Sequence, residues 1–252
     1  MVIYDEADEI YLQEGNHVSI ININKYLTEN KVQVQTVLFS ATYPENVIKQ
    51  IKQFLQNFEA FYMQAKALKL KGVKQFRIHM TPAEKIEFIG EVYETFEKSQ
   101  TIIFTNKKAD AKLLQSKLTS LGQKAEILIG GIDVAVRDRI IDDFRKTSIS
   151  TLICTNVLAR GIDVPEVDLV INYDVPVLCP APGWVDPDVA NYMHRVGRTG
   201  RFGTDGVAVS LTSDETMEDM LDQIAKYYEI EINKLEGIKG LKEVLDAMRN
   251  QD

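Results

Sequence analysis

The sequence contains few of the residues that cross-link small folds or bind metals. Its 252 residues include two cysteines, Cys154 and Cys179, which argues against a disulfide framework. Its histidines, His17, His79 and His194, are scattered and do not give the ligand spacing of a structural zinc site. We find no uninterrupted apolar run of bilayer length and no signal peptide. We therefore expect a reducing, intracellular setting without membrane insertion.

Basic charge is also scarce. The 29 Lys and Arg residues are outnumbered by 37 Asp and Glu residues, which gives a net charge of −8 and a pI of about 5.1. No overall positive field favours nucleic acid, so any such binding must rest on a local cluster. A further absence concerns nucleotides, because no G-x-x-x-x-G-K-S/T sequence occurs. That loop is the main ligand of the β- and γ-phosphates in many nucleotidases.

The remaining composition is that of a globular protein, with 45% apolar and 26% charged residues. Hydrophobic periodicity is lost around residues 64–74, where lysines alternate with small residues. From Gln75 onward, predicted strands and helices alternate, which is typical of a mostly parallel sheet with helices on both faces. We assign residues 1–65 to a first domain portion, 66–74 to a linker, 75–235 to an α/β domain and 236–252 to a helical tail.

Within the α/β domain, short apolar runs predict the strands and turn residues delimit them. Thr81 and Glu84 form a capping box that opens a helix through Phe96. Four prolines between Pro176 and Pro187 predict an irregular loop. The predicted strands are Phe76–Met80, Thr101–Phe104, Ala125–Ile129, Thr151–Cys154, Leu169–Asn172 and Val207–Leu211.

Near the start of the chain, polar residues follow two short apolar runs. Asp5-Glu6-Ala7-Asp8 comes after Met1–Tyr4, at the position where open α/β sheets place ligand chemistry. An Asp there could hold Mg²⁺ and a neighbouring Glu could orient or deprotonate water. The alternative is an acidic helix N-terminus favoured by the helix dipole. Ser40-Ala41-Thr42 follows Thr36–Phe39 and predicts either a cross-link between loops or an N-cap.

In the α/β domain, Asn106, Gly130-Gly131 and Thr155 each follow a predicted strand. Parallel strands share one carboxyl edge, so we expect these residues to converge. Backbone N–H groups, a hydroxyl and Arg137 could together follow a nucleic-acid backbone without much net positive charge. Taken singly, each residue could equally be a turn or a helix cap.

The segment His194–Arg201 contains three arginines and two glycines. Arginine matches phosphate oxygens with a planar fork, and glycine permits tight turns, so a loop that aims guanidinium groups at a polyphosphate is one interpretation. A basic, glycine-rich surface turn is the other. Between this loop and Thr155, Asp163 could accept hydrogen bonds from ribose hydroxyls.

In this order, the motifs closely resemble those of the DEAD-box RNA helicases. They are Asp5–Asp8, Ser40–Thr42, Thr155–Asp163 and His194–Arg201. The Thr-Asn-Val variant at Thr155 and the proline-rich segment ending near Asp188 look most like the branch that serves mRNA export at the nuclear pore. The resemblance implies a complete second RecA-like domain, preceded by a remnant of the first, ATP-binding RecA-like domain.

The resemblance also implies roles, with ATP and Mg²⁺ as cofactors. Asp5 would serve Mg²⁺ through water, and Glu6 would activate the attacking water. In the family pattern, Arg198 and Arg201 are fingers on the γ-phosphate. Further nucleotide or coupling roles fall on Asp8, Ser40, Thr42, Asp163 (at the ribose) and His194, and RNA-backbone contacts on Gly131, Arg137 and Thr155. Val134 departs from the family, which often has Gln there.

At the level of the whole protein, the family implies ATP-dependent unwinding of short RNA duplexes or remodelling of RNA–protein complexes. Expected partners are RNA, bound independently of sequence, and mRNA-export and nuclear-pore factors. We expect a monomer located in cytoplasm and nucleus. Without the phosphate loop and the adenine-reading glutamine motif, which should precede Asp5, the chain alone should hydrolyse ATP barely or not at all. The strands of the remnant should lack sheet neighbours.

Two other functions fit the residues. A non-enzymatic module could bind RNA or a partner through the same loops. A DNA-directed relative is the third candidate, because sequence alone does not show recognition of the 2′-hydroxyl.

Overall fold

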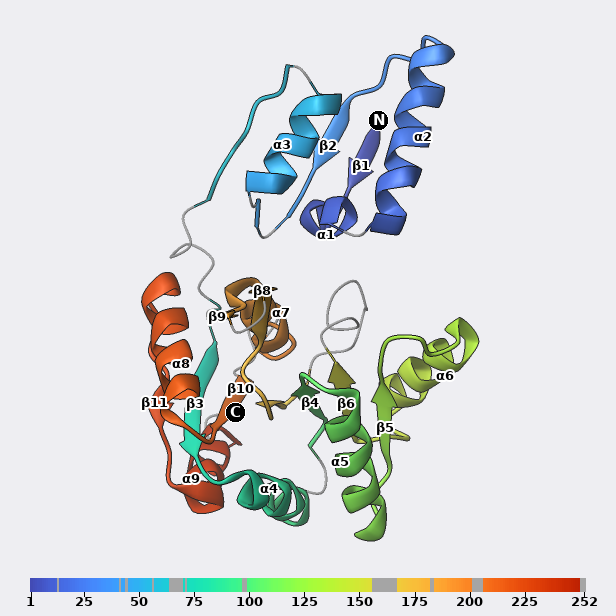
Figure 1. The fold of residues 1–252 in the computed structure, drawn as a ribbon. Coiled ribbons are helices and arrows are strands. Elements are labelled where there is room, and N and C mark those ends of the chain that lie inside the picture. Colours follow the sequence, from blue (N-terminus) through green and yellow to red (C-terminus); the bar gives the residue numbers. More distant parts are fainter. Residues whose placement is uncertain are drawn as a thin grey trace. The chain divides into compact units, whose positions relative to one another are not determined.

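The computed structural model describes residues 1–12, 14–40, 42–43, 45–55, 57–63, 70, 72–96, 99–155, 167–181, 184–200 and 206–249. The chain divides into two compact units, Met1–Tyr62 and Met63–Asp252. Figure 1 shows the elements of each unit. No helix in the described ranges has the length and apolarity needed to cross a bilayer.

The first unit is built on a small parallel sheet. In its described part, β1 (Val2–Tyr4) pairs with β2 (Thr36–Leu38). Helices α1 (Ala7–Leu12), α2 (Glu14–Glu29) and α3 (Glu45–Phe54) complete it. The buried core consists of Tyr4, Ala7, Tyr11, Ile20, Val47 and Ile51. Ile3 is 58% exposed and Phe39 is 57% exposed, so apolar side chains of the strand region remain open to solvent.

The second unit contains a seven-stranded sheet in the described ranges, with the order β11-β3-β10-β7-β4-β6-β5. Every recorded pairing in this sheet is parallel, which confirms the predicted α/β class. The strands are β3 (Val73–His79), β4 (Thr101–Thr105), β5 (Ala125–Leu128), β6 (Thr151–Thr155), β7 (Leu169–Asn172), β10 (Gly206–Thr212) and β11 (Asn233–Lys234).

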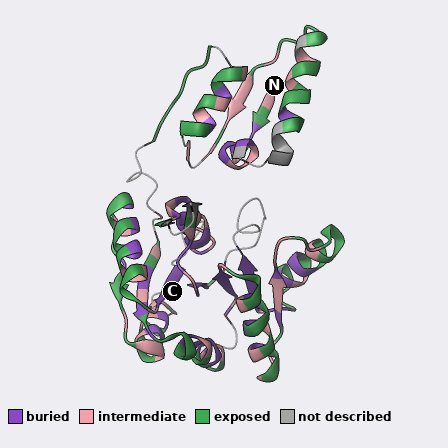
Figure 2. Ribbon diagram, viewed as in Figure 1, coloured by how far each residue is buried: buried purple, intermediate pink, exposed green. Residues whose placement is uncertain are grey.

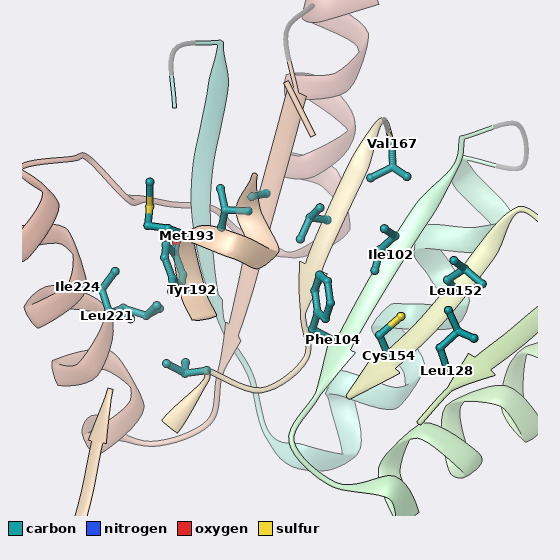
Figure 3. Packing of buried hydrophobic residues seen from close by; sticks show 14 of the residues in the cluster. Ile102, Phe104, Leu128, Leu152, Cys154, Val167, Tyr192, Met193, Leu221 and Ile224 are labelled. Carbon is teal, nitrogen blue, oxygen red and sulfur yellow. The ribbon is translucent and has the colours of Figure 1, made fainter. Parts of the chain in front are cut away.

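Helices cover both faces of this sheet, as predicted. On one face lie α6 (Val134–Arg145), α7 (Val189–Val196) and α8 (Glu215–Tyr228). On the other lie α4 (Pro82–Thr95), α5 (Lys108–Ser120) and α9 (Gly237–Arg249). The central strands are buried throughout (Figure 2). Their side chains alternate between two cores, one of which is drawn in Figure 3.

Local signals in the sequence explain several element ends. Thr81 accepts the N–H of Glu84 and the Glu84 carboxylate accepts the N–H of Thr81, so the predicted capping box opens α4. The helix ends at Thr95 with Phe96 as its C-cap. Gly122, with φ +78°, follows the end of α5 in the left-handed conformation that glycine adopts at low cost.

The structure differs from the sequence prediction at several places, of which two concern predicted boundaries and loops. β3 begins at Val73, before the boundary predicted at residue 75. The segment predicted as an irregular loop forms an antiparallel hairpin of β8 (Val177–Ala181) and β9 (Trp184–Pro187). Its register shifts between Leu178 and Ala181, and the hairpin belongs to a separate two-stranded sheet. Prolines are compatible with such edge positions, because few ladder donors are needed there.

Candidate functional site

The acidic turn of the first unit follows β1 directly. The Ala7 N–H donates to the Phe39 carbonyl at 2.9 Å, which ties the turn to the residue after β2. Asp5 is exposed, and its Oδ1 accepts the N–H of Glu6 at 3.0 Å. Glu6 has φ +51°, a left-handed conformation that is uncommon for a residue other than glycine and is often found at functional sites.

Asp8 lies at the centre of a hydrogen-bond cluster with Ser40 and Thr42. It is buried, and its Oδ2 accepts the Thr42 hydroxyl at 2.5 Å. Ser40 Oγ accepts the backbone N–H groups of Asp8 and Thr42, each at 3.4 Å. The two segments predicted to interact are therefore joined through side chains. Of the two earlier interpretations of Ser40–Thr42, this geometry favours the cross-link.

Asp5 is suited to magnesium only in part. In the described portion of the chain, no group of three or more His, Cys, Asp or Glu side chains is arranged to hold a metal. Mg²⁺ in phosphoryl-transfer sites is commonly bound by one or two carboxylates together with waters and substrate phosphates. The exposed carboxylate of Asp5 fits that role, so nucleotide phosphates and water would have to supply the other ligands.

In the second unit, the predicted strand-end residues lie on one edge. Thr105 of β4 pairs in register with Thr155 of β6, and Leu128 of β5 pairs with Cys154. The turn at Gly130 and Gly131 therefore starts beside Thr155. Gly131 is exposed and has φ +92°, so its backbone is open to a ligand.

The hydroxyl of Thr155 has a property that favours a ligand. The residue is 5% exposed, and its Oγ1 has no hydrogen-bond partner in the described structure. Buried polar atoms are nearly always paired, so an unpaired one at a candidate site favours a partner that binds there. Arg137, half-buried on α6, makes 3.3 Å contacts with the exposed carboxylate of Asp138. Exposed pairs of this kind are weak, so Arg137 can exchange partners readily.

The arginine loop lies at the opposite end of the sheet. The Arg198 carbonyl accepts the N–H of Val167, just before β7, and Thr199 Oγ1 donates to the Val167 carbonyl at 2.5 Å. Gly200 has φ +71°, and a Cβ there would lie 2.5 Å from Val73 Cγ2. The loop is therefore fixed to the amino ends of β3 and β7, and Arg198 is half-buried beside it.

Arg195 points inward and was not singled out from the sequence. It is fully buried, and its guanidinium donates to the Asp174 carbonyl at 2.7 Å and to Asn106 Oδ1 at 2.9 Å. Its Cζ lies 5.2 Å from the centroid of the Phe104 ring. Burial lowers the pKa of Arg195 to about 10, so it remains charged at neutral pH. Its acceptors follow the carboxyl ends of β4 and β7.

Helix α7 therefore joins the two ends of the sheet. Its Arg195 side chain binds residues at the carboxyl edge, and the loop after it is held at the amino ends. The helical spacing in the sequence indicates that Arg195 points inward, because it falls on the same helix face as Tyr192 and Val196. His194 is half-buried on the same helix. Asp163 and Arg201 lie outside the described residues.

A family comparison identifies the class of the second unit. Residues 84–203 match the model of the helicase conserved C-terminal domain, in agreement with the parallel sheet and the arginine loop. A solved C-terminal domain of the DEAD-box protein Dbp5 is 39% identical, with a TM-score of 0.64, and the match covers 71% of this chain and 99% of that one. The chain belongs to the DEAD-box RNA helicase family.

Three further matches, to two relatives, extend over nearly the whole chain. The ATP-dependent RNA helicase dbp5 of Aspergillus clavatus is 37% identical over 99% of this chain and 51% of its own length. Saccharomyces cerevisiae Dbp5 bound to RNA and ADP BeF3 is 36% identical, with a TM-score of 0.85, over 98% of this chain and 62% of that chain. A variant bound to Nup159, Gle1, IP6 and ADP is 33% identical, with a TM-score of 0.67, over 98% and 63%. The chain thus spans about half the length of the curated relatives it matches.

Proposed function

We propose that this chain acts in an ATP-dependent RNA helicase that separates short RNA duplexes or remodels RNA–protein complexes. The observation that carries the proposal is α7, which connects the strand-end edge with the arginine loop through Arg195. This helix offers a physical route by which RNA binding at one end could be coupled to a nucleotide at the other.

On the RNA side, Gly131, Arg137 and Thr155 would contact the phosphate backbone. The exposed glycine backbone, the loosely paired guanidinium and the buried hydroxyl, which has no partner among the residues that the structure describes, are neutral or singly charged donors. Such contacts position a strand without recognising its bases, so binding would be independent of sequence. They also allow a protein with a net charge of −8 to bind a polyanion.

On the nucleotide side, Arg198 and Arg201 would stabilise charge on the γ-phosphate, and Asp163 would bind the ribose. Asp5 would hold Mg²⁺ through water, and Glu6 would orient or deprotonate the attacking water. Asp8, Ser40 and Thr42 form one hydrogen-bonded cluster, which together with His194 would link the state of the nucleotide to domain closure. Mg²⁺ would offset phosphate charge during the transfer.

Partners follow from the relatives. S. cerevisiae Dbp5 has been solved with RNA and with Nup159 and Gle1, which supports RNA and export or nuclear-pore factors as partners of this chain. We propose a monomer that works in mRNA export, in cytoplasm and nucleus.

The chain by itself should hydrolyse ATP barely or not at all, because its sequence holds no phosphate loop. This absence also keeps a second function open, in which the chain is a non-enzymatic module that binds RNA or a partner. Adding the N-terminal part of a relative that carries the phosphate loop separates the two. RNA-stimulated ATP hydrolysis by the completed protein supports the helicase, and RNA binding without hydrolysis supports the module.

The completed protein also tests the arginine assignment. Arg198→Ala should lower the rate of ATP turnover far more than RNA affinity, because a finger acts on the transferred phosphate. Equal losses in both would contradict the assignment. RNA-stimulated ATP hydrolysis by the 252-residue chain alone would contradict the proposal that the phosphate loop is required.

A further inference from the structure

Lys108 makes a contact that the proposed mechanism does not use. It is the first residue of α5, and its Nζ donates to the Gly130 carbonyl oxygen at 2.7 Å. This contact links the residues that follow β4 to the turn that follows β5. The N-cap residue of α5, Lys107, has no recorded side-chain capping bond within the described ranges. At the start of this helix, the side chain that contacts the turn after β5 is therefore that of Lys108.

The turn that Lys108 contacts is centred on Gly130 and Gly131, and its central peptide can take the type I or the type II orientation. The Ile132 N–H donates to the Ile129 carbonyl at 3.4 Å, so Gly130 and Gly131 are its central residues. Gly131 has φ +92° and Gly130 lies outside the positive region, which is the pattern of a type II turn. Type I and type II turns differ mainly in the orientation of their central peptide. Two glycines make its rotation inexpensive.

The Lys108 contact selects one of these orientations. The peptide joining Gly130 and Gly131 is planar and trans, so its C=O and N–H point in opposite directions. When Lys108 holds the carbonyl toward α5, the Gly131 N–H must point away from that helix. Gly131 is exposed, and no acceptor for its N–H is recorded within the described ranges.

We propose that Lys108 is a positioning residue for phosphate binding: it locks the Gly130–Gly131 peptide so that the Gly131 N–H is presented to an RNA phosphate. The inference rests on the proposed RNA function and deepens it. Lys108 acts through the turn and does not itself contact the phosphate. Holding the peptide in this way costs little conformational free energy, because the exposed Lys108 side chain has to maintain one hydrogen bond.

The first test examines the free 252-residue chain by NMR with glycine-selective ¹⁵N labelling. Lys108→Met should move the amide resonance of Gly131, because the peptide loses its lock. Lys112→Met is the matched control, since Lys112 is exposed on the same helix and has no recorded hydrogen bond or ion pair in the described structure. A Gly131 resonance that responds equally to both variants, or to neither, overturns the inference.

The second test measures binding of a labelled oligouridylate by fluorescence anisotropy. Lys108→Met should weaken binding by about fivefold, the effect of one lost hydrogen bond. Gly131→Ala should have a similar effect, because alanine disfavours the positive φ, although open space surrounds the position of its Cβ. The double variant should bind about as well as either single variant, since both act on the same peptide.

Salt dependence distinguishes positioning from direct contact. A lysine that neutralises a phosphate contributes about 0.7 to the slope of log affinity against log salt for single strands. The slope of Lys108→Met should match that of Lys112→Met, and Lys108→Arg should restore affinity. A slope lower by about 0.7, or additive losses in the double variant, would make Lys108 a direct ligand and overturn the inference. Absence of RNA binding by the wild-type chain would overturn the proposed function itself, whereas the NMR result on the free chain is independent of RNA.

Discussion

Arg195 Nη2 donates to Asn106 Oδ1 at 2.9 Å, and this bond joins α7 to the end of β4 inside the second unit. Asn106 is itself fixed, because its N–H donates to Asp174 Oδ2 and its Nδ2 donates to the Val175 carbonyl, each at 2.8 Å. The arginine is therefore held by a side chain with little freedom to move. A buried charge stabilises only when its donors are satisfied, so this pair should be sensitive to small changes.

Replacing Arg195 with lysine should lower the free energy of unfolding by roughly 2 to 4 kcal/mol, because lysine keeps the charge but not the planar fork. Urea unfolding followed by circular dichroism measures this. Arg137→Lys is the control, since its pair with Asp138 is exposed and should matter by less than about 0.5 kcal/mol. Equal effects of the two substitutions would show that the buried network contributes little.

Gly200→Ala should destabilise the arginine loop for two reasons. Its φ of +71° disfavours alanine, and the new Cβ would lie 2.5 Å from Val73 Cγ2. Gly122→Ala separates these effects, because Gly122 has φ +78° with nothing within 4 Å of the added atom. We expect a loss of about 1 kcal/mol for Gly122→Ala and clearly more for Gly200→Ala by urea unfolding. Equal losses of unfolding free energy in the two variants would mean that the structure relaxes around Val73 and the close contact costs nothing.

Thr155→Val should separate stability from RNA affinity. Among the described residues the buried hydroxyl has no hydrogen-bond partner, so its replacement by a methyl group should leave the free energy of unfolding unchanged or raise it. Affinity for single-stranded RNA should nevertheless fall by about tenfold if the hydroxyl meets a phosphate. Thr105→Val gives the comparison: Thr105 donates to the Lys107 carbonyl at 3.1 Å, so that variant should lose about 1 kcal/mol of stability. Unchanged RNA affinity in Thr155→Val would remove Thr155 from the site.

Cys154 should make the stability of the second unit depend on alkaline pH. Burial raises the pKa of its thiol from 9.0 to about 12, so the folded chain keeps a proton that the unfolded chain releases. Its contribution is therefore complete below pH 9 and falls as the pH rises from 9 toward 12, with a slope of up to about 1.4 kcal/mol per pH unit.

Because buried tyrosines also titrate in this range, the measurement is the difference between wild type and Cys154→Ala. Urea unfolding at several pH values should show a weaker alkaline loss in the variant. Alkylation at pH 9 followed by peptide mass spectrometry gives an independent check, in which Cys154 reacts only as the unit unfolds. Rapid labelling under native conditions would contradict the burial of this thiol.

The strands and the faces of the sheet were predictable because burial imposes strong patterns. The run Ile102–Phe104 is apolar throughout, and the turn-forming residues Ser99 and Asn106 lie on either side of it, which together predict a central parallel strand. The capping box at Thr81 is a local signal that requires no knowledge of the rest of the fold. These features depend on contacts within a few residues or on the simple alternation of strand and helix.

Other features depended on distant contacts. The β8–β9 hairpin is rich in proline, and local preferences alone indicate a loop there. β11 has only two residues, Asn233 and Lys234, and both are exposed, so no hydrophobic pattern marks it. The inward direction of Arg195 is set by Asn106 and Asp174, which are far away in the sequence. Charge and glycine content predict a basic loop but do not show that Arg195 is buried while Arg198 is only half-buried.

Helix α9 has a practical consequence for anyone who shortens the protein. Leu241 is fully buried and Leu245 nearly so, and both belong to the core that also contains Phe88 and Ile89 of α4. A chain that ends at residue 235 would expose the apolar surface that α9 covers. Such a chain should aggregate or bind chaperones. Helix α9 is thus part of the folded domain, and any shortened version of the protein should retain it.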